Sequence, residues 1–163
     1  MTYLNKIPKK IVLTKGVGVG STNLNSFDSA LLNAGVGNLN LVKVSSIIPS
    51  GAKIINISKG FTKDLPLPGS LTPAVYSFIS SSRSGERITA VLVVGIPKNK
   101  KKSGIIFELA RNDSFQKAKR SCEKMIKEAF RMRGIKLDKI FLVGDEAIVK
   151  DEITTVIAIA LLI

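Results

Sequence analysis

Two long apolar runs set the fold class of this chain. The segments "ERITAVLVVGIP" (86–97) and "ITTVIAIALLI" (153–163) are rich in β-branched residues, which favour strands. The second run is too short to cross a bilayer as a helix, so it is predicted to form a buried strand. Both runs therefore indicate a sheet-based core.

Local patterns predict further strands, turns and helices along the chain. Apolar patterns predict strands at 10–14, 53–58, 74–80, 103–110 and 139–143, and a strand that carries residues 44–49. The glycine-rich segments "KGVGVGST" (15–22) and "GVGNLN" (35–40) are predicted to be turns. They lack the spacing of a dinucleotide fingerprint and the ending of a P-loop.

Two helices are expected between these strands. The first is predicted to start at a cap formed by Asn25 or Ser26, to run through Ala34 and to stop at Gly35. The second lies in "NDSFQKAKRSCEKMIKEAFRMRG" (112–134), where Asp113 is the expected N-cap. Many strands with two helices in mixed order predict a single α+β domain with mostly antiparallel or mixed sheets.

Missing residue types exclude several kinds of chemistry. The chain has no histidine, which excludes imidazole acid–base catalysis and the Ser-His-Asp triad. Its single cysteine, Cys122, permits neither an internal disulfide nor a thiolate metal cluster. No metal is therefore expected. Cys122 lies at helical spacing among apolar residues, so it is predicted to be a core residue, and a cytoplasmic setting fits.

The net charge of +13 raises the question of an anionic partner. Apart from "KNKKK" (98–102), the basic residues are scattered along the sequence, and there is no tryptophan to stack on bases. Nucleic acid is therefore not the expected partner. A basic α+β nucleic-acid-binding module without catalytic activity stays open as an alternative.

A pair of serines stands out in the apolar segment "LNLVKVSSIIPSG", at Ser45 and Ser46. A serine hydroxyl can attack the carbonyl of the preceding residue where the backbone is strained and the oxyanion is stabilised. The resulting ester can break by elimination, and hydrolysis of the dehydroalanine then leaves a pyruvoyl group. Such a ketone can form a Schiff base with an amine and accept electrons without a bound cofactor such as pyridoxal phosphate.

The segment "LNSFDSALLNAGVGNLNLVKVSSIIPSGAKII" (24–55) resembles the self-processing region of the pyruvoyl-dependent arginine decarboxylase family. The segments "LTPAVYSFISS", "GERITAVLVVGIPKNK", "GIIFELA" and "AFRMRGIKLDKI" are also similar to that family in order and spacing. The resemblance implies cleavage between Ser45 and Ser46, giving a β chain of residues 1–45 and an α chain of residues 46–163 that begins with a pyruvoyl group. It also implies decarboxylation of arginine to agmatine through a Schiff base.

The same resemblance implies roles for individual residues. Asn40 would support self-cleavage by hydrogen bonding, Glu108 would donate a proton during turnover, and Asp28 would bind the substrate guanidinium group. The pocket would be lined by Leu31, Gly37, Leu39, Ser45 and Ile47. A change of substrate to another amino acid stays open.

The family further implies a four-layer α/β/β/α sandwich, assembled as a trimer or a dimer of trimers with active sites between subunits. No membrane partner is expected. One departure from the family pattern is Ser50, which stands where a second proline is usual.

Overall fold

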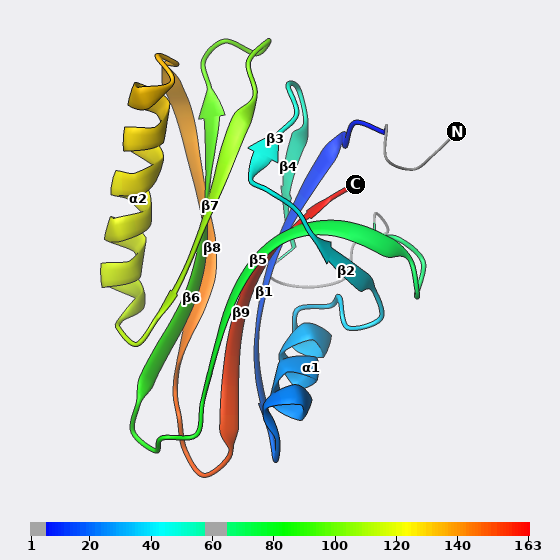
Figure 1. The fold of residues 1–163 in the computed structure, drawn as a ribbon, viewed down its shortest axis with the longest axis vertical. Helices are drawn as coiled ribbons and strands as arrows, with labels where there is room; N and C mark the ends of the chain where they lie inside the picture. Colours follow the sequence, from blue (N-terminus) through cyan, green and yellow to red (C-terminus); the bar gives the residue numbers. More distant parts are fainter. Residues whose placement is uncertain (1–5, 58–64) are drawn as a thin grey trace.

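The computed structural model describes residues 6–57 and 65–163. Within these ranges the chain forms two helices and two β-sheets, which confirms the predicted α+β class (Figure 1). Neither helix is long and apolar enough to span a membrane.

The first sheet is mixed and has five strands in the order β2-β5-β9-β1-β4. Its parallel pairs are β1 with β4 and β2 with β5, and β9 pairs antiparallel with both β1 and β5. The bounds of its strands are β1 (Lys10–Gly20), β2 (Asn40–Lys43), β4 (Lys53–Asn56), β5 (Leu71–Ser81) and β9 (Ile153–Leu162). The strand predicted at 53–58 therefore ends early, and its last position lies outside the described residues.

The second sheet is antiparallel and has four strands in the order β3-β7-β6-β8. Its strands are β3 (Ile47–Ile48), β6 (Arg87–Pro97), β7 (Gly104–Arg111) and β8 (Leu137–Ile148). The two apolar runs that predicted buried strands become β6 and β9, which are interior strands of their sheets. Both predictions are confirmed.

Three apolar clusters hold the elements together. The largest lies between the two sheets and includes Leu13, Leu92 and Val156. A second joins α1 (Asn23–Asn33) to the five-stranded sheet, and a third joins α2 (Phe115–Met132) to the four-stranded sheet. The two helices therefore cover the outer faces of the two sheets, as Figure 1 shows.

The turn predicted at 15–22 is wrong, because β1 continues through this segment to Gly20. A Cβ atom on Gly16 would lie 2.1 Å from the Ala30 carbonyl oxygen, and one on Gly18 would lie 2.1 Å from the Ala30 nitrogen. These glycines let α1 approach the strand at backbone distance. The pattern that indicated a turn reflects close helix–strand packing.

The helix boundaries differ from the prediction by a few residues. Thr22 caps α1, since its hydroxyl accepts a hydrogen bond from the Asn25 nitrogen at 3.1 Å. The predicted cap Ser26 is instead buried and bonds Thr155 at 2.7 Å. Gly35 does follow the end of α1, with φ at 77°. The N-cap of α2 is Ser114 rather than Asp113.

Candidate active site

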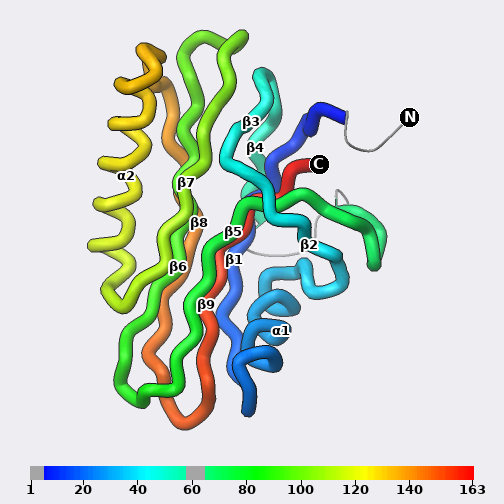
Figure 2. The backbone as a smooth tube through the Cα atoms, in the orientation of Figure 1, coloured from blue at the N-terminus to red at the C-terminus, as the bar shows by residue number. Residues whose placement is uncertain are grey.

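The serine pair lies where the chain passes from one sheet to the other. The expected single strand through 44–49 is wrong, because the chain forms two strands here and the serine pair lies between them. Strand β2 ends at Lys43 in the five-stranded sheet, and β3 begins at Ile47 in the four-stranded sheet. The connecting segment crosses between the sheets, as the tube in Figure 2 shows. This segment can accommodate two adjacent hydroxyl groups because the Ser45 side chain is exposed and the Ser46 side chain is only half-buried.

Backbone hydrogen bonds hold this crossing segment at both ends. The Val44 nitrogen donates to the Ala74 carbonyl in β5 at 3.0 Å. The Ser46 carbonyl accepts from the Ile106 nitrogen in β7 at 2.8 Å. The peptide bond between Ser45 and Ser46 therefore lies between two backbone groups, the Val44 nitrogen and the Ser46 carbonyl, that are each hydrogen-bonded to a strand. In the described residues, the Ser46 hydroxyl has no hydrogen-bond partner, so nothing holds it away from the preceding carbonyl.

The backbone at the serine pair does not adopt a positive φ. In the described ranges, no residue other than glycine has a positive φ. The serine pair is thus held by the two anchoring hydrogen bonds in a backbone without positive φ.

Glu108 lies on the same strand as the anchor of Ser46. It is two residues beyond Ile106 on β7, about 7 Å further along the strand and on the same face. Ile106 and Ala110 on that face belong to the apolar cluster between the sheets. The Glu108 side chain is 28% exposed, so it lies at the edge of this core rather than inside it.

Lys43 was not singled out from the sequence, yet it lies beside the predicted proton donor. Its Nζ atom is 3.9 Å from Glu108 Oε1 and 5.0 Å from the centre of the Tyr76 ring. Glu108 therefore has the apolar inter-sheet cluster on one side and a cation on the other. The contact joins residues 65 positions apart in the sequence, so no local pattern signals it.

Asn40 forms hydrogen bonds at the start of β2. It opens β2, at the far end of that strand from the serine pair. Its side-chain amide donates to the Gly69 carbonyl at 2.7 Å, and its backbone nitrogen donates to Ser70 at 3.0 Å. Asn40 therefore fixes the start of β2 against the 65–70 segment.

The predicted substrate-binding residues fall into two groups. Ser45 and Ile47 lie with Ser46 at the crossing segment, and Ile47 is 47% exposed. The other group lies on or after α1, on the outer side of the five-stranded sheet, and consists of Asp28, Leu31, Gly37 and Leu39. Asp28 is exposed there, and no ion pair or hydrogen bond in the described residues joins it to Glu108.

The region around α1 presents an apolar surface to solvent. Leu24 is 75% exposed and Phe78 is 48% exposed, and Phe27 packs edge-on against Phe78 with ring centres 4.7 Å apart. A shallow groove of about 580 Å³ is lined by these side chains together with Asn23, Ile79 and Ser80. These exposed side chains, gathered around α1, form an apolar patch on this face of the molecule.

Comparison with known proteins agrees with the predicted resemblance. Residues 10–163 match the family model described as "Pyruvoyl-dependent arginine decarboxylase (PvlArgDC)". A protein of that name from Methanocaldococcus jannaschii is 43% identical over 135 residues, which is 83% of this chain and 78% of the relative. Another, from Pyrococcus abyssi, is 38% identical over 151 residues, or 93% of this chain and 92% of the relative. This chain therefore belongs to the pyruvoyl-dependent arginine decarboxylase family.

Proposed function

We propose that this protein decarboxylates arginine to agmatine and carbon dioxide, using a pyruvoyl group made from its own Ser46. Family membership supports the reaction. The observation that carries the proposal on this chain is the position of the Ser45–Ser46 peptide bond, which is anchored to β5 on one side and to β7 on the other.

Self-cleavage begins with attack of the Ser46 Oγ atom on the carbonyl carbon of Ser45. The peptide bond shifts to an ester, and elimination then removes the α-proton of residue 46 and breaks its Cβ–Oγ bond. Ser45 becomes a new carboxyl terminus, and residue 46 becomes dehydroalanine. Tautomerisation and addition of one water release ammonia and leave the ketone. The anchored carbonyl of Ser46 and the unbonded hydroxyl fit this chemistry, because the backbone is fixed while the nucleophile can rotate.

The pyruvoyl ketone supplies an electrophile for the substrate amine and an acceptor for the electrons that carbon dioxide leaves behind. Residues of the chain itself deliver the proton and bind the substrate. Glu108 delivers a proton to the substrate α-carbon from the edge of the inter-sheet core. Asp28 binds the guanidinium group through a charge-assisted pair. Leu31, Leu39 and Ile47 make apolar contacts with the substrate, and Gly37 leaves space for it in the pocket. Asn40 supports self-cleavage by hydrogen bonding.

An active site shared between subunits would explain why the proposed substrate-binding residues lie in two separate groups, one at the serine pair and one at α1. Asp28 and its neighbours lie on the outer side of the five-stranded sheet, away from Glu108 in the same chain. The exposed apolar groups around α1 support burial of this face against a second subunit. A trimer or a dimer of trimers, built from protomers with a four-layer α/β/β/α sandwich, would bring Asp28 of one subunit to the serine pair of the next.

Intact mass spectrometry of freshly purified protein tests the proposal. We expect two fragments, residues 1–45 and 46–163, the second beginning with a pyruvoyl group. Ser46→Ala should leave one uncut, inactive chain. Ser45→Ala is the matched control and should still cleave, because residue 45 contributes its carbonyl and not its hydroxyl. A cleaved Ser46→Ala chain would exclude the proposed nucleophile.

Release of carbon dioxide from a panel of amino acids tests the substrate. Arginine should react in preference to lysine and ornithine, because only a planar guanidinium group can pair with a carboxylate through two parallel hydrogen bonds. Preference for another amino acid in a cleaved enzyme would keep the self-processing proposal and reject arginine as the substrate.

A further inference from the structure

The solvent-facing side of α2 carries a continuous row of cations, here called the basic ridge. Its members follow one another at spacings of three or four residues, so they share one face of the helix. All are exposed, and they are Arg120, Lys124, Lys127 and Arg131. The row spans about 16 Å of helix. The apolar side of α2 is buried against the four-stranded sheet.

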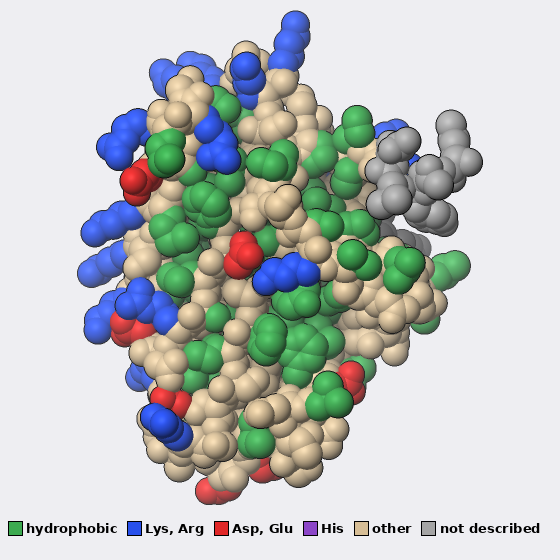
Figure 3. Space-filling view, in the orientation of Figure 1, with side chains coloured by type: hydrophobic (Ala, Val, Ile, Leu, Met, Phe, Trp, Pro, Cys, Tyr) green, Lys and Arg blue, Asp and Glu red, His purple; other side chains and the backbone are tan. Residues whose placement is uncertain are grey.

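A second group of cations continues the ridge beyond the end of α2. The Lys98 nitrogen donates to the Lys136 carbonyl at 2.9 Å, which joins the β6–β7 turn to the α2–β8 turn. The exposed cations of these two turns, here called the basic turn, are Lys98, Lys100, Lys101, Lys102, Arg133 and Lys136. Figure 3 shows Lys and Arg side chains projecting along the α2 edge and at the adjacent end of the molecule.

Few acids offset this charge. In the described residues, none of the ridge or turn cations makes an ion pair, whereas Glu123 is 4.0 Å from Lys119 at the side of the ridge. Glu128 is the remaining acid on α2. Like charges at these helical spacings destabilise a helix, so the row does not serve the stability of α2. Residues that look scattered in the sequence are thus gathered by the fold on one surface.

We propose that the basic ridge and the basic turn bind the phosphate backbone of double-helical DNA. An α-helix with its side chains is about 10–12 Å wide, which matches the major groove of about 12 Å. The ridge consists of Lys and Arg alone, so it contacts phosphates rather than reading bases.

Other anionic partners fit this surface less well. The major groove of double-stranded RNA is too narrow for side chains to enter. Single strands need aromatic stacking platforms, and the ridge has none. Membrane-surface helices insert an apolar face, but the apolar face of α2 lies on the sheet.

This surface is separate from the proposed catalytic site. Phe107 and Leu109 pack in the cluster under α2, whereas Ile106 and Ala110 face the other sheet. Alternation along β7 places Glu108 on the side away from α2. DNA binding can therefore change while arginine decarboxylation stays the same.

Fluorescence anisotropy with a labelled 24-base-pair DNA duplex tests the proposal, using the purified full-length protein at several salt concentrations. The ridge variant combines Arg120→Gln, Lys124→Gln, Lys127→Gln and Arg131→Gln. It should bind about tenfold or more weakly than wild type. Affinity falls as salt rises, with a slope of about −0.9 in log affinity against log salt for each phosphate contact. Loss of four contacts should therefore make this slope less steep by about 3–4. Unchanged arginine decarboxylation would show that the variant is folded.

A matched control removes the same charge elsewhere, from exposed residues outside the surface: Lys9→Gln, Lys53→Gln, Arg83→Gln and Lys150→Gln. This control should keep most of the affinity and the salt slope. An equal loss of DNA affinity in both variants would mean that net charge alone causes the binding, which would overturn the proposal. Undiminished DNA binding by the ridge variant would also overturn it. Tighter binding to duplex RNA, to single strands or to phosphatidylserine vesicles would also overturn it. A variant in which each ridge Lys is replaced by Arg and each ridge Arg by Lys keeps the positive charge and should therefore still bind DNA.

Discussion

The Lys43 ammonium lies 3.9 Å from the Glu108 carboxylate, although the two residues belong to different sheets. Lys43 ends β2, and only Val44 separates it from the serine pair. Glu108 lies on β7, whose Ile106 nitrogen holds the Ser46 carbonyl. The end of β2, which leads to the serine pair, is thus in contact with the proposed proton donor.

Glu108→Gln should separate turnover from self-cleavage. The amide keeps the size of the side chain but cannot deliver the proton, so we expect kcat to fall by about 10²–10⁴. The chain should still be cut, because the Ser46 anchor involves the backbone of β7 and not this side chain. Glu128→Gln, on the exposed side of α2, is the control. Wild-type kcat in the cleaved Glu108→Gln enzyme would remove Glu108 from the mechanism.

Asp28→Asn should weaken arginine binding while leaving processing intact. A carboxylate within about 4 Å of the guanidinium group contributes on the order of 4 kcal/mol at an effective dielectric near 20. Competing water reduces that gain, so we expect KM to rise by about 10- to 100-fold. The same change at the exposed residue Asp138 should leave KM unchanged. Steady-state kinetics and a denaturing gel measure both effects, and an unaltered KM for Asp28→Asn would reject the assignment.

Much of the fold could be predicted from local patterns, because periodicity and composition determine burial. The segments that became β6, β9 and α2 were long and strongly patterned, and their existence and type are confirmed. Helix caps were less predictable, since Thr22 and Ser114 compete with other polar residues one to four positions away that can also cap.

The errors came from contacts made across the chain. Nothing in "GVGVG" distinguishes a turn from a strand that a helix approaches closely, because glycine suits both. Likewise, the apolar residues around the serine pair match one strand in sequence but divide between two sheets in space. The contact of Lys43 with Glu108 has no local signal at all.

Gly18→Ala should prevent close packing of α1 on β1. The new Cβ atom would lie 2.1 Å from the Ala30 nitrogen and 2.6 Å from the Ser26 carbonyl oxygen, and neither backbone atom can move without shifting the helix. We expect a loss of about 3 kcal/mol or more in the free energy of unfolding. Val19→Ala, at a position that is 50% exposed, should cost less than about 1 kcal/mol. Urea denaturation measures both, and near-equal stabilities would contradict the proposed helix–strand contact.

Cys122 should be unreactive in the folded protein. Burial in the apolar cluster under α2 raises the pKa of its thiol to about 11. Near pH 8 only about one molecule in a thousand then carries the reactive thiolate. We expect negligible alkylation by iodoacetamide in native buffer and complete alkylation in guanidinium chloride, measured by intact mass. Rapid labelling of the native protein would show that α2 opens readily from the sheet.

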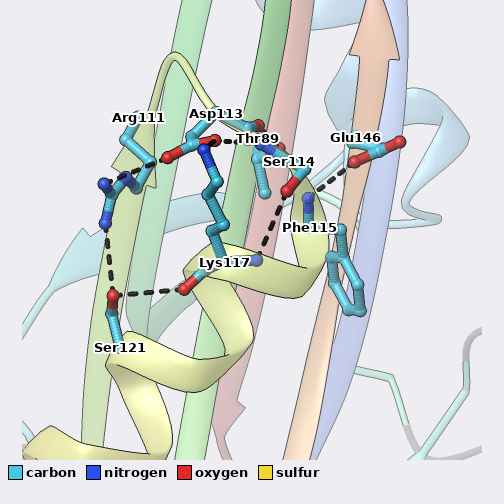
Figure 4. A network of polar contacts seen from close by, with 8 residues as sticks. All are labelled: Thr89, Arg111, Asp113, Ser114, Phe115, Lys117, Ser121 and Glu146. Atoms are coloured by element: carbon cyan, nitrogen blue, oxygen red, sulfur yellow. Dashed lines mark hydrogen bonds and ion pairs between the residues drawn. The ribbon is translucent and has the colours of Figure 1, made fainter.

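Asp113 makes stability depend on pH in the acid range. The Ser114 backbone N–H donates to its carboxylate, and Lys117 and Arg111 lie beside it, as Figure 4 shows. The hydrogen bond from Ser114 is the main reason why the pKa of Asp113 lies below its ordinary value of 3.8. A carboxyl group with a lower pKa in the folded state stabilises that state above its unfolded pKa. This contribution disappears as pH falls through the folded pKa.

Asp113→Asn should therefore lower Tm at pH 7, and the difference from wild type should close in strong acid. The asparagine oxygen can still accept from Ser114, so the variant removes the charge and keeps the acceptor. Thermal unfolding followed by circular dichroism between pH 7 and about pH 2.5 measures the difference. Asp151→Asn, at an exposed acid in the β8–β9 turn, is the control and should show a smaller shift. A difference for Asp113→Asn that stays constant across this range would mean that the carboxylate charge does not stabilise the start of α2.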